Sequence, residues 1–260
     1  MKNKEKILYI LKENSEKFVS GEDIAAELGI SRTAIWKNIN SLKNDGYIIT
    51  SVTNQGYRIE KGSDILDGQQ ILDMINEDNP NMKINIEIVD KISSTNTKLS
   101  EKALIGADEG YILIAKEQTN GRAHNGKRFE SPDNVGLYFS ILLRPDNKTF
   151  SDCKIISKKA EKIMKEVLEN IAGKEIEIKE GNGLFVRGMK VCGILTDVYG
   201  DAETSRVNFV VLGIGVNLYK FENGNEKNMP NTSKEKTYLF DEIYTGAKNI
   251  IVASFVKELL

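Results

Sequence analysis

The sequence predicts an α+β protein, in which a small helical module ending in a hairpin precedes a larger domain built around a mixed sheet. The first sixty residues carry short helical stripes followed by a strand-turn-strand pattern. From Ile65 onward, strand-like runs alternate with helical ones. A length of 260 residues with 40% apolar residues suits one small and one large unit. We therefore expect domains over residues 1–62 and 66–260, with Lys61-Gly62-Ser63 in the linker.

Composition argues against membrane and secreted classes. No apolar run approaches the ~20 residues needed to span a bilayer, and the charged start at Met1–Lys6 is unlike a signal peptide. The two cysteines, Cys153 and Cys192, lie far apart in the sequence and lack metal-ligand spacing. This cysteine usage is typical of a protein in a reducing compartment. We therefore expect a cytoplasmic protein with no membrane partner. The net charge of −2 gives no overall nucleic-acid signature, although residues 1–61 hold ten Lys/Arg against eight Asp/Glu.

Three helices are predicted in the amino-terminal module. The first has an apolar stripe of Ile7, Leu8, Ile10 and Leu11. We expect Ser20 to cap a second helix over 21–28 and Gly29 to end it with positive φ. Ser31 is expected to cap a third helix, which Asp45-Gly46 ends. The buried face of this third helix is expected to carry Ile35, Ile39 and Leu42.

Two helices joined by a tight turn containing glycine indicate a helix-turn-helix, whose second helix enters the major groove of DNA. The face opposite its apolar stripe offers hydroxyl, amide, cationic and aromatic groups suited to bases, phosphates and sugars. The candidate DNA-binding residues are Ser31, Arg32, Thr33, Trp36, Lys37 and Asn40. Strand-like runs at 47–52 and 57–60 around a Thr53–Gly56 turn predict a wing. We interpret the module as a winged helix-turn-helix that binds DNA; a three-helix domain that binds protein is the alternative.

In the larger domain we expect six strands and two helices. The strands are expected at residues 84–89, 111–115, 137–143, 176–179, 193–198 and 208–214. The helices are expected at 94–105 and 153–171. The second helix has an apolar stripe typical of core packing, formed by Ile156, Ala160, Ile163, Val167 and Ile171.

Two phosphate-binding motifs are only approximated. Gly121–Lys127 has the Gly-x4-Gly-Lys spacing of a P-loop, but Arg128 stands where that motif needs Ser or Thr. Gly213-Ile214-Gly215 hints at a dinucleotide fingerprint, but Leu218 occupies the third glycine position. Both motifs are therefore rejected. What remains is a Gly/Arg-rich loop suited to anions, in which Arg122 can hold phosphate or carboxylate oxygens in bidentate fashion.

Several ordered segments resemble one known family. Gln118–Arg122, running on to Phe129–Pro132 and Gly136–Ser140, resembles the signature loop of biotin–protein ligases. Three further segments agree in the family's order: Ser94-Thr95-Asn96, Lys190–Leu195 and Gly213–Asn217. With the winged helix in front, the chain resembles the bifunctional biotin ligase/repressors over nearly its whole length. That resemblance implies adenylation of biotin with ATP and Mg²⁺, and transfer to a lysine of a biotin carboxyl carrier protein.

The resemblance also implies the site residues and the partners. The residues implied for biotin are Ser94, Thr95, Asn96, Gln118, Gly121, Arg122, Ala123, His124, Lys190 and Gly193. Those implied for the nucleotide and catalysis are Arg122, Lys190, Asn182 and Asn217, since bringing two anions together needs preorganised cations. Biotin and ATP/Mg are expected as substrates or effectors, with no tightly bound cofactor and no assigned metal ligand. Family members form a homodimer on a DNA operator when the effector binds.

Three departures from the family pattern leave the activity open. The family's Lys-Trp-Pro-Asn-Asp segment reads Lys179–Gly183 here, which removes a carboxylate and a rigid proline from the nucleotide region. Ala123, His124 and Asn125 stand where the family's loop is richer in glycine and arginine. The family adds a small β-barrel domain, expected after the helix near Ala247. The alternatives are an active ligase that also represses, a regulator that senses biotin without adenylating it, and a domain that binds another small acid such as lipoate.

Overall fold

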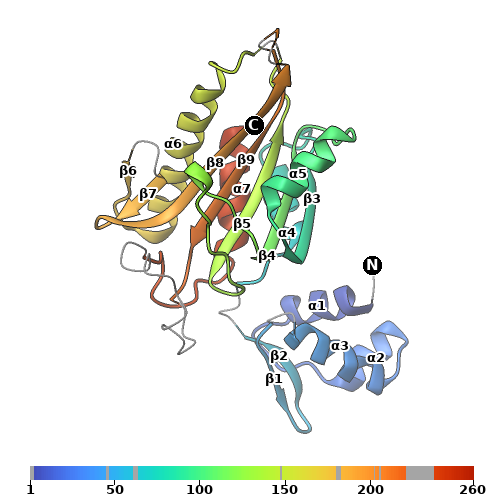
Figure 1. Cartoon of the computed structure of the whole chain (residues 1–260). Coiled ribbons are helices and arrows are strands. Elements are labelled where there is room, and N and C mark those ends of the chain that lie inside the picture. Colours follow the sequence, from blue (N-terminus) through green and yellow to red (C-terminus); the bar gives the residue numbers. More distant parts are fainter. Residues whose placement is uncertain are drawn as a thin grey trace. The chain divides into compact units, whose positions relative to one another are not determined.

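The computed structural model describes residues 3–44, 47–60, 64–146, 148–179, 183–201, 203–204, 206–220 and 237–260 (Figure 1). The chain divides into two compact units, one of Met1–Leu66 with Ile243–Ala247 and one of Asp67–Glu242 with Lys248–Leu260. The predicted helix stop at Asp45-Gly46, the Lys61–Ser63 linker and the segment 180–182 lie outside the described residues. Within the described ranges, no helix is long and apolar enough to cross a membrane.

The first unit begins with three helices at the expected places. They are α1 (Asn3–Glu13), α2 (Gly21–Leu28) and α3 (Arg32–Asn44). Ser20 caps α2, because its hydroxyl accepts a hydrogen bond from Glu22 N at 3.0 Å. Gly29 ends α2 with φ 65°, and Ser31 Oγ accepts from Ala34 N at 3.2 Å at the start of α3. The three predicted caps are confirmed.

A hairpin follows and packs against the helices. Strands β1 (Ile49–Val52) and β2 (Gly56–Ile59) pair antiparallel. Val19 and Tyr57 exchange two backbone hydrogen bonds of 2.8 and 2.9 Å, which ties the hairpin to the segment before α2. A Cβ on Gly56 would overlap Val19 O, so this close approach requires glycine. The shared core holds the predicted helix residues together with hairpin residues: Ile7, Ile10, Leu11, Ile24, Ile35, Ile39, Leu42, Tyr47, Ile49 and Ile59. The unit has the winged helix-turn-helix arrangement.

The second unit is built on a seven-stranded mixed sheet in the order β3-β4-β5-β9-β8-β7-β6. Its strands are β3 (Asn85–Ile92), β4 (Tyr111–Gln118), β5 (Gly136–Leu143), β6 (Glu177–Lys179), β7 (Gly183–Val186), β8 (Met189–Asp201) and β9 (Arg206–Asn217). Among the strands that the structure describes, only β3 and β4 pair in parallel. The predicted α+β class is confirmed. Strand β7 was not predicted, because four residues are too few to show a period.

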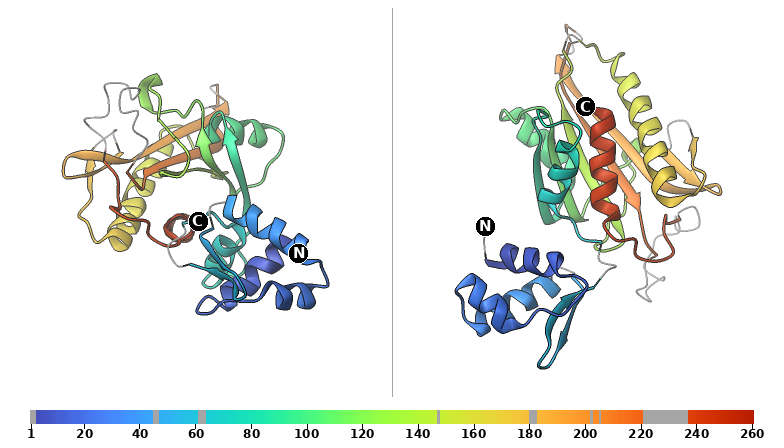
Figure 2. Two further views of the ribbon diagram at one scale, coloured as in Figure 1. Left: turned by 90° about the horizontal axis from the view of Figure 1, so that it is seen from below. Right: turned by 180° about the vertical axis from the view of Figure 1, so that it is seen from behind.

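Helices cover both faces of this sheet (Figures 1 and 2). The front face is the one turned toward the viewer in Figure 1, and α5 (Thr95–Leu104) crosses it. The back face is covered by α4 (Gly68–Asn76), α6 (Cys153–Ala172) and α7 (Ala247–Leu259). Strand β5 is buried along its whole length, as expected of a central strand. Helix α4 was not predicted; Asp67 caps it by accepting from Gln69 N and Gln70 N, both at 3.1 Å.

The buried face of α6 differs in part from the predicted stripe. Ala160, Ile163 and Val167 are buried as expected, whereas Ile156 and Ile171 are only half-buried. Met164 and Leu168 are fully buried, and they lie one residue after Ile163 and Val167. The buried stripe of α6 is therefore wider than predicted along the middle of the helix.

Candidate functional site

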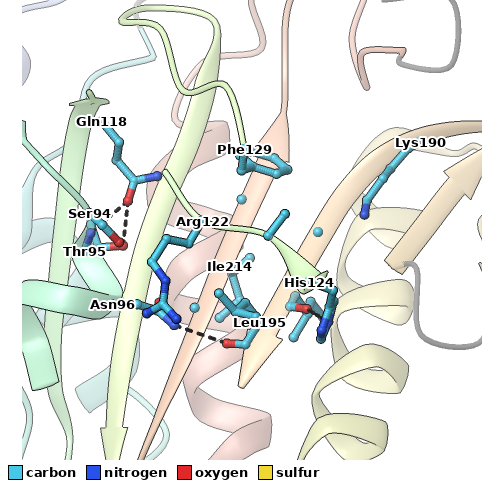
Figure 3. Close-up of a pocket in the computed structure, with 15 residues that line it drawn as sticks. Ser94, Thr95, Asn96, Gln118, Arg122, His124, Phe129, Lys190, Leu195 and Ile214 are labelled. Carbon is cyan, nitrogen blue, oxygen red and sulfur yellow. Dashed lines mark hydrogen bonds between the residues drawn. The ribbon is translucent and has the colours of Figure 1, made fainter. Parts of the chain in front are cut away.

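The candidate site is a pocket on the front face of the sheet, partly open to solvent (Figure 3). Nine of the ten residues that the resemblance implied for biotin line it: Ser94, Thr95, Asn96, Gln118, Arg122, Ala123, His124, Lys190 and Gly193. The tenth, Gly121, lies at the root of the loop, where a Cβ would overlap Phe129 O. Residues from three separate segments, 94–96, 118–124 and 190–193, therefore meet at one place.

Three glycines form the floor of the pocket. Gly193 and Gly215 are partners across β8 and β9, and Gly213 lies two residues before Gly215 on the same face. A Cβ on Gly215 would lie 2.5 Å from Phe129 Cε1, and one on Gly193 would lie 3.0 Å from Phe129 Cε2. A Cβ on Gly213 would overlap Asn96 Oδ1. The missing side chains therefore make the room in which Phe129 and Asn96 sit.

The Ser94-Thr95-Asn96 turn forms one wall at the start of α5. Ser94 caps the helix through Thr97 N at 3.5 Å, and all three side chains are buried. Thr95 and Asn96 both bond to the fully buried Ser140, at 2.7 and 2.6 Å. The helix cap therefore places these polar groups at the pocket.

Gln118, the last residue of β4, connects this turn to the loop. Its Oε1 accepts from Thr95 N at 2.8 Å and from Thr95 Oγ1 at 3.1 Å. Its Nε2 donates to Ser131 Oγ at 2.8 Å, and Ser131 Oγ donates to Phe129 O at 3.0 Å. These bonds fix the orientation of the amide.

The loop after β4 folds back on itself over the front face. Ala123 N donates to Lys127 O at 2.8 Å, and Phe129 N donates to Gly121 O at 2.9 Å. At its root, Arg122 makes a bidentate ion pair with Asp197, at 2.8 and 3.3 Å. His124 lies further along, with Nε2 2.8 Å from Ile194 O. The anion-binding interpretation of Arg122 is therefore modified, since its guanidinium already holds a carboxylate.

An aromatic wall lies across the floor from the turn. Phe129 and Tyr138 meet edge to face with centroids 6.3 Å apart. Tyr138 donates to Pro132 O at 3.0 Å, and burial raises the pKa of its phenol. Burial also raises the pKa of the nearby Cys192 thiol to about 12, so this thiol stays protonated at neutral pH and is no nucleophile.

Asn217, which the resemblance implied for the nucleotide, is not among the residues that line the pocket. Asn217 ends β9, and its carbonyl accepts from Leu239 N at 3.0 Å. Asn182 lies outside the described residues. Phe129, Leu195 and Ile214 also line the pocket and were not predicted as site residues. Asp197, which bonds to Arg122, and Ser140, which bonds to Asn96, were not predicted either. A period of two along β8, counted from Gly193, would have placed Leu195 and Asp197 on the pocket face.

In the first unit, α3 presents the candidate DNA-binding residues as predicted from its period. Ser31, Arg32, Thr33, Trp36 and Lys37 are exposed, and Asn40 is half-buried. Trp36 is 57% exposed, which is unusual for this side chain. Arg32 forms an ion pair with Glu22 of α2, and both side chains are largely exposed. Lys43 Nζ donates to Ser51 Oγ at 2.9 Å, which joins α3 to the hairpin.

Comparison with protein families supports both units. Residues 3–58 match the HTH domain family, and residues 88–217 match the biotin/lipoate A/B protein ligase family. The second match covers half of the chain. The chain therefore belongs to the biotin/lipoate A/B protein ligase family, which confirms the resemblance seen in the motifs.

The chain is also similar to individual proteins named as bifunctional ligase/repressors. The chain is 32% identical over 212 residues to the bifunctional ligase/repressor BirA of Bacillus subtilis, a match that covers 82% of this chain and 64% of that protein. It is 30% identical over 202 residues to the bifunctional ligase/repressor BirA of Escherichia coli, covering 77% and 60%. The chain thus spans less than two thirds of these relatives' length. The biotin protein ligase from Aquifex aeolicus in complex with biotin and ATP shares the fold, with a TM-score of 0.53 at 23% identity over 67% of this chain and 70% of that one.

Proposed function

We propose that this protein is a biotin-responsive repressor that also acts as a biotin–protein ligase, using ATP to attach biotin to a lysine of a carrier protein. One observation carries the proposal: nine of ten residues implied for biotin by sequence motifs line a single pocket. These residues come from positions 94 to 193, so their meeting in space is not a consequence of sequence proximity. The similarity to the bifunctional relatives supports the same function.

The chemistry of the pocket suits a ligand with a polar head, an apolar body and an anionic tail. At one end, the Ser94 hydroxyl and the second N–H of Gln118 offer hydrogen bonds for a ureido group. Phe129 and Leu195 provide apolar surface for rings and methylenes. At the loop end, His124 and Lys190 line the pocket where a carboxylate and a phosphate need cationic or donor groups.

A second candidate is a regulator that binds biotin without adenylating it. Gly183 stands where the family carries an acidic residue, and it adopts φ 96°, a conformation that favours glycine. A Cβ there would overlap Cys192 O and lie 3.2 Å from Lys190 Cε. The backbone has therefore adapted to glycine, and the family's carboxylate could not be restored without moving it. This observation favours weaker binding of Mg²⁺-ATP, because the chain lacks a carboxylate ligand for the metal at this position.

We propose further that the first unit binds an operator as part of a homodimer. The exposed face of α3 carries two cations and an exposed tryptophan. A ligand that favours the dimer favours DNA binding by the same free energy, so biotin or its adenylate would act as the corepressor. A two-fold dimer would read a palindromic operator.

The test separates these functions in one set of reactions. The protein is incubated with biotin, ATP and Mg²⁺, with and without a carrier domain, and lipoate replaces biotin in a parallel set. Biotinylated carrier supports the ligase. Biotin binding by calorimetry without adenylate supports the regulator. Transfer of lipoate in place of biotin contradicts both and supports the small-acid alternative.

A further inference from the structure

Asp197 lies on β8, on the sheet face that carries the pocket. Its side chain forms hydrogen bonds with two residues that line the pocket. Its carboxylate accepts from Arg122 Nη1 at 2.8 Å and from Arg122 Nη2 at 3.3 Å. Its Oδ2 also accepts from Asn96 Nδ2 at 3.0 Å. The Asp197 side chain is only 14% exposed, whereas that of Arg122 is 43% exposed. One largely buried carboxylate therefore joins the root of the loop to the first turn of α5.

A chain of hydrogen bonds continues from this carboxylate. It passes from Asn96 to Ser140 at 2.6 Å and from Ser140 to Thr95 at 2.7 Å. Thr95 N then donates to Gln118 Oε1 at 2.8 Å, and Gln118 Nε2 donates to Ser131 Oγ at 2.8 Å. Arg122 stands near the start of the loop and Ser131 near its end. The loop is thus bonded near both ends to one polar network. In this network Asp197 is the charged residue that the sheet provides, and Arg122 is the one that the loop provides. Figure 3 shows the residues that line the pocket.

We propose that Asp197 is a positioning residue for the pocket, which holds the Arg122 guanidinium and the Asn96 amide in the arrangement that receives the ligand. The proposal rests on the proposed function for the identity of that ligand. A bidentate guanidinium–carboxylate pair has a defined geometry, so it fixes both the direction of Arg122 and the position of the loop root. Groups ordered before binding do not lose that freedom on binding, which increases affinity.

Electrostatics alone predicts the opposite effect of losing this carboxylate. Asp197 neutralises Arg122, so its removal would leave a cation beside a pocket proposed to bind an anionic tail. If attraction of charge dominated, biotin would bind more tightly without Asp197. If positioning dominates, binding weakens, because an amide at this position would turn an N–H₂ toward donors of Arg122 or Asn96. The sign of the change therefore decides between the two accounts.

The first measurement is the calorimetric affinity for biotin of the full chain and three variants. Asp197→Asn is expected to weaken binding about tenfold or more, as for loss of hydrogen bonds to a charged group. Asp197→Glu keeps the charge and is expected to recover part of the affinity. Asp90→Asn removes another ion-paired carboxylate, 88% exposed on β3, and is expected to change nothing. Unchanged or tighter binding by Asp197→Asn overturns the proposal.

A double-mutant cycle tests whether Asp197 acts through Arg122. Arg122→Ala is combined with Asp197→Asn, and the two effects on biotin affinity are compared with their sum. A positioning role predicts that Asp197→Asn costs clearly less affinity in the Arg122→Ala background than in the wild-type chain. Fully additive effects would show that the two residues act independently, which contradicts the proposal.

Trypsin provides a readout that does not depend on biotin. The loop carries cleavage sites after Lys127 and Arg128, and its root is held by the Arg122–Asp197 pair. Asp197→Asn is expected to speed cleavage there, with Asp197→Glu intermediate and Asp90→Asn like wild type. Equal rates in all four proteins overturn the proposal. A wild-type chain that fails to bind biotin refutes the proposed function instead, and the cleavage rates still decide the role of Asp197.

Discussion

Gly213→Ala tests whether the glycine floor holds the polar network in place. The added Cβ would overlap Asn96 Oδ1, so the Asn96 side chain has to move. That movement breaks its bonds to the fully buried Ser140 at 2.6 Å and to Asp197 at 3.0 Å. Overpacking costs about 1–3 kcal/mol, and a buried polar group left without its partner costs a further ~1–3 kcal/mol. We therefore expect a loss of roughly 3 kcal/mol in the free energy of unfolding of the second unit.

Urea unfolding followed by circular dichroism measures this loss. With a slope of about 2–3 kcal/mol per molar urea, the midpoint should fall by about 1 M. Trp36 is the only tryptophan and lies in the first unit, so its fluorescence serves as an internal reference that should not shift. The matched control is Gly68→Ala, whose Cβ would lie 3.5 Å from Ile86 Cγ2, an ordinary contact, and it should be neutral or slightly stabilising. A Gly213→Ala midpoint equal to that of wild type would refute the reasoning.

Three further predictions concern pH, DNA and the nucleotide. The hydrogen bond from Tyr111 lowers the pKa of Glu87 below its ordinary 4.5, so its contribution to stability is present above pH 4.5 and is lost as pH falls through the lowered value. Glu87→Gln should therefore lose less stability than wild type between pH 7 and pH 3 in urea titrations, and an equal loss contradicts this. Arg32→Ala with Lys37→Ala should reduce the salt slope of operator binding by about 2, while an unchanged slope excludes α3 as the phosphate-contacting helix. Lys190→Gln should slow adenylate formation about 100-fold, whereas an unchanged rate removes Lys190 from the chemistry.

Much of the first unit could be predicted because its signals are local. A cap, a positive-φ glycine and an apolar period each lie within a few residues, as at Ser20, Gly29 and Ile35–Leu42. Strand boundaries in the second unit were less accurate: β8 and β9 extend several residues beyond the predicted runs. Their extra residues are paired with neighbouring strands, and backbone pairing leaves no mark on the sequence of a single strand.

The pocket was predicted only where motifs marked it. The Ser94–Asn96 turn and the Gln118–Arg122 loop have a recognisable order, so their residues were found. Asp197 belongs to none of the motifs, and Ser140 ends the Gly136–Ser140 motif without being implied there as a site residue. Their importance comes from contacts across the sheet, since Asp197 reaches a residue 75 positions earlier and Ser140 one 44 positions earlier. The ion pair also changes the meaning of Arg122, from a cation awaiting a ligand to one that is already paired.

The most direct test of the central claim is a calorimetric titration of biotin into the wild-type chain and into Gly193→Val. Gly193 lies in the floor of the pocket, and a Cβ there would already lie 3.0 Å from the Phe129 ring, so the larger side chain forces Phe129 out of the wall proposed to contact the ligand. We predict saturable binding of one biotin per wild-type chain and a loss of at least about tenfold in affinity for the variant. No binding by the wild-type chain, or equal affinity in both proteins, would contradict the assignment of this pocket to biotin.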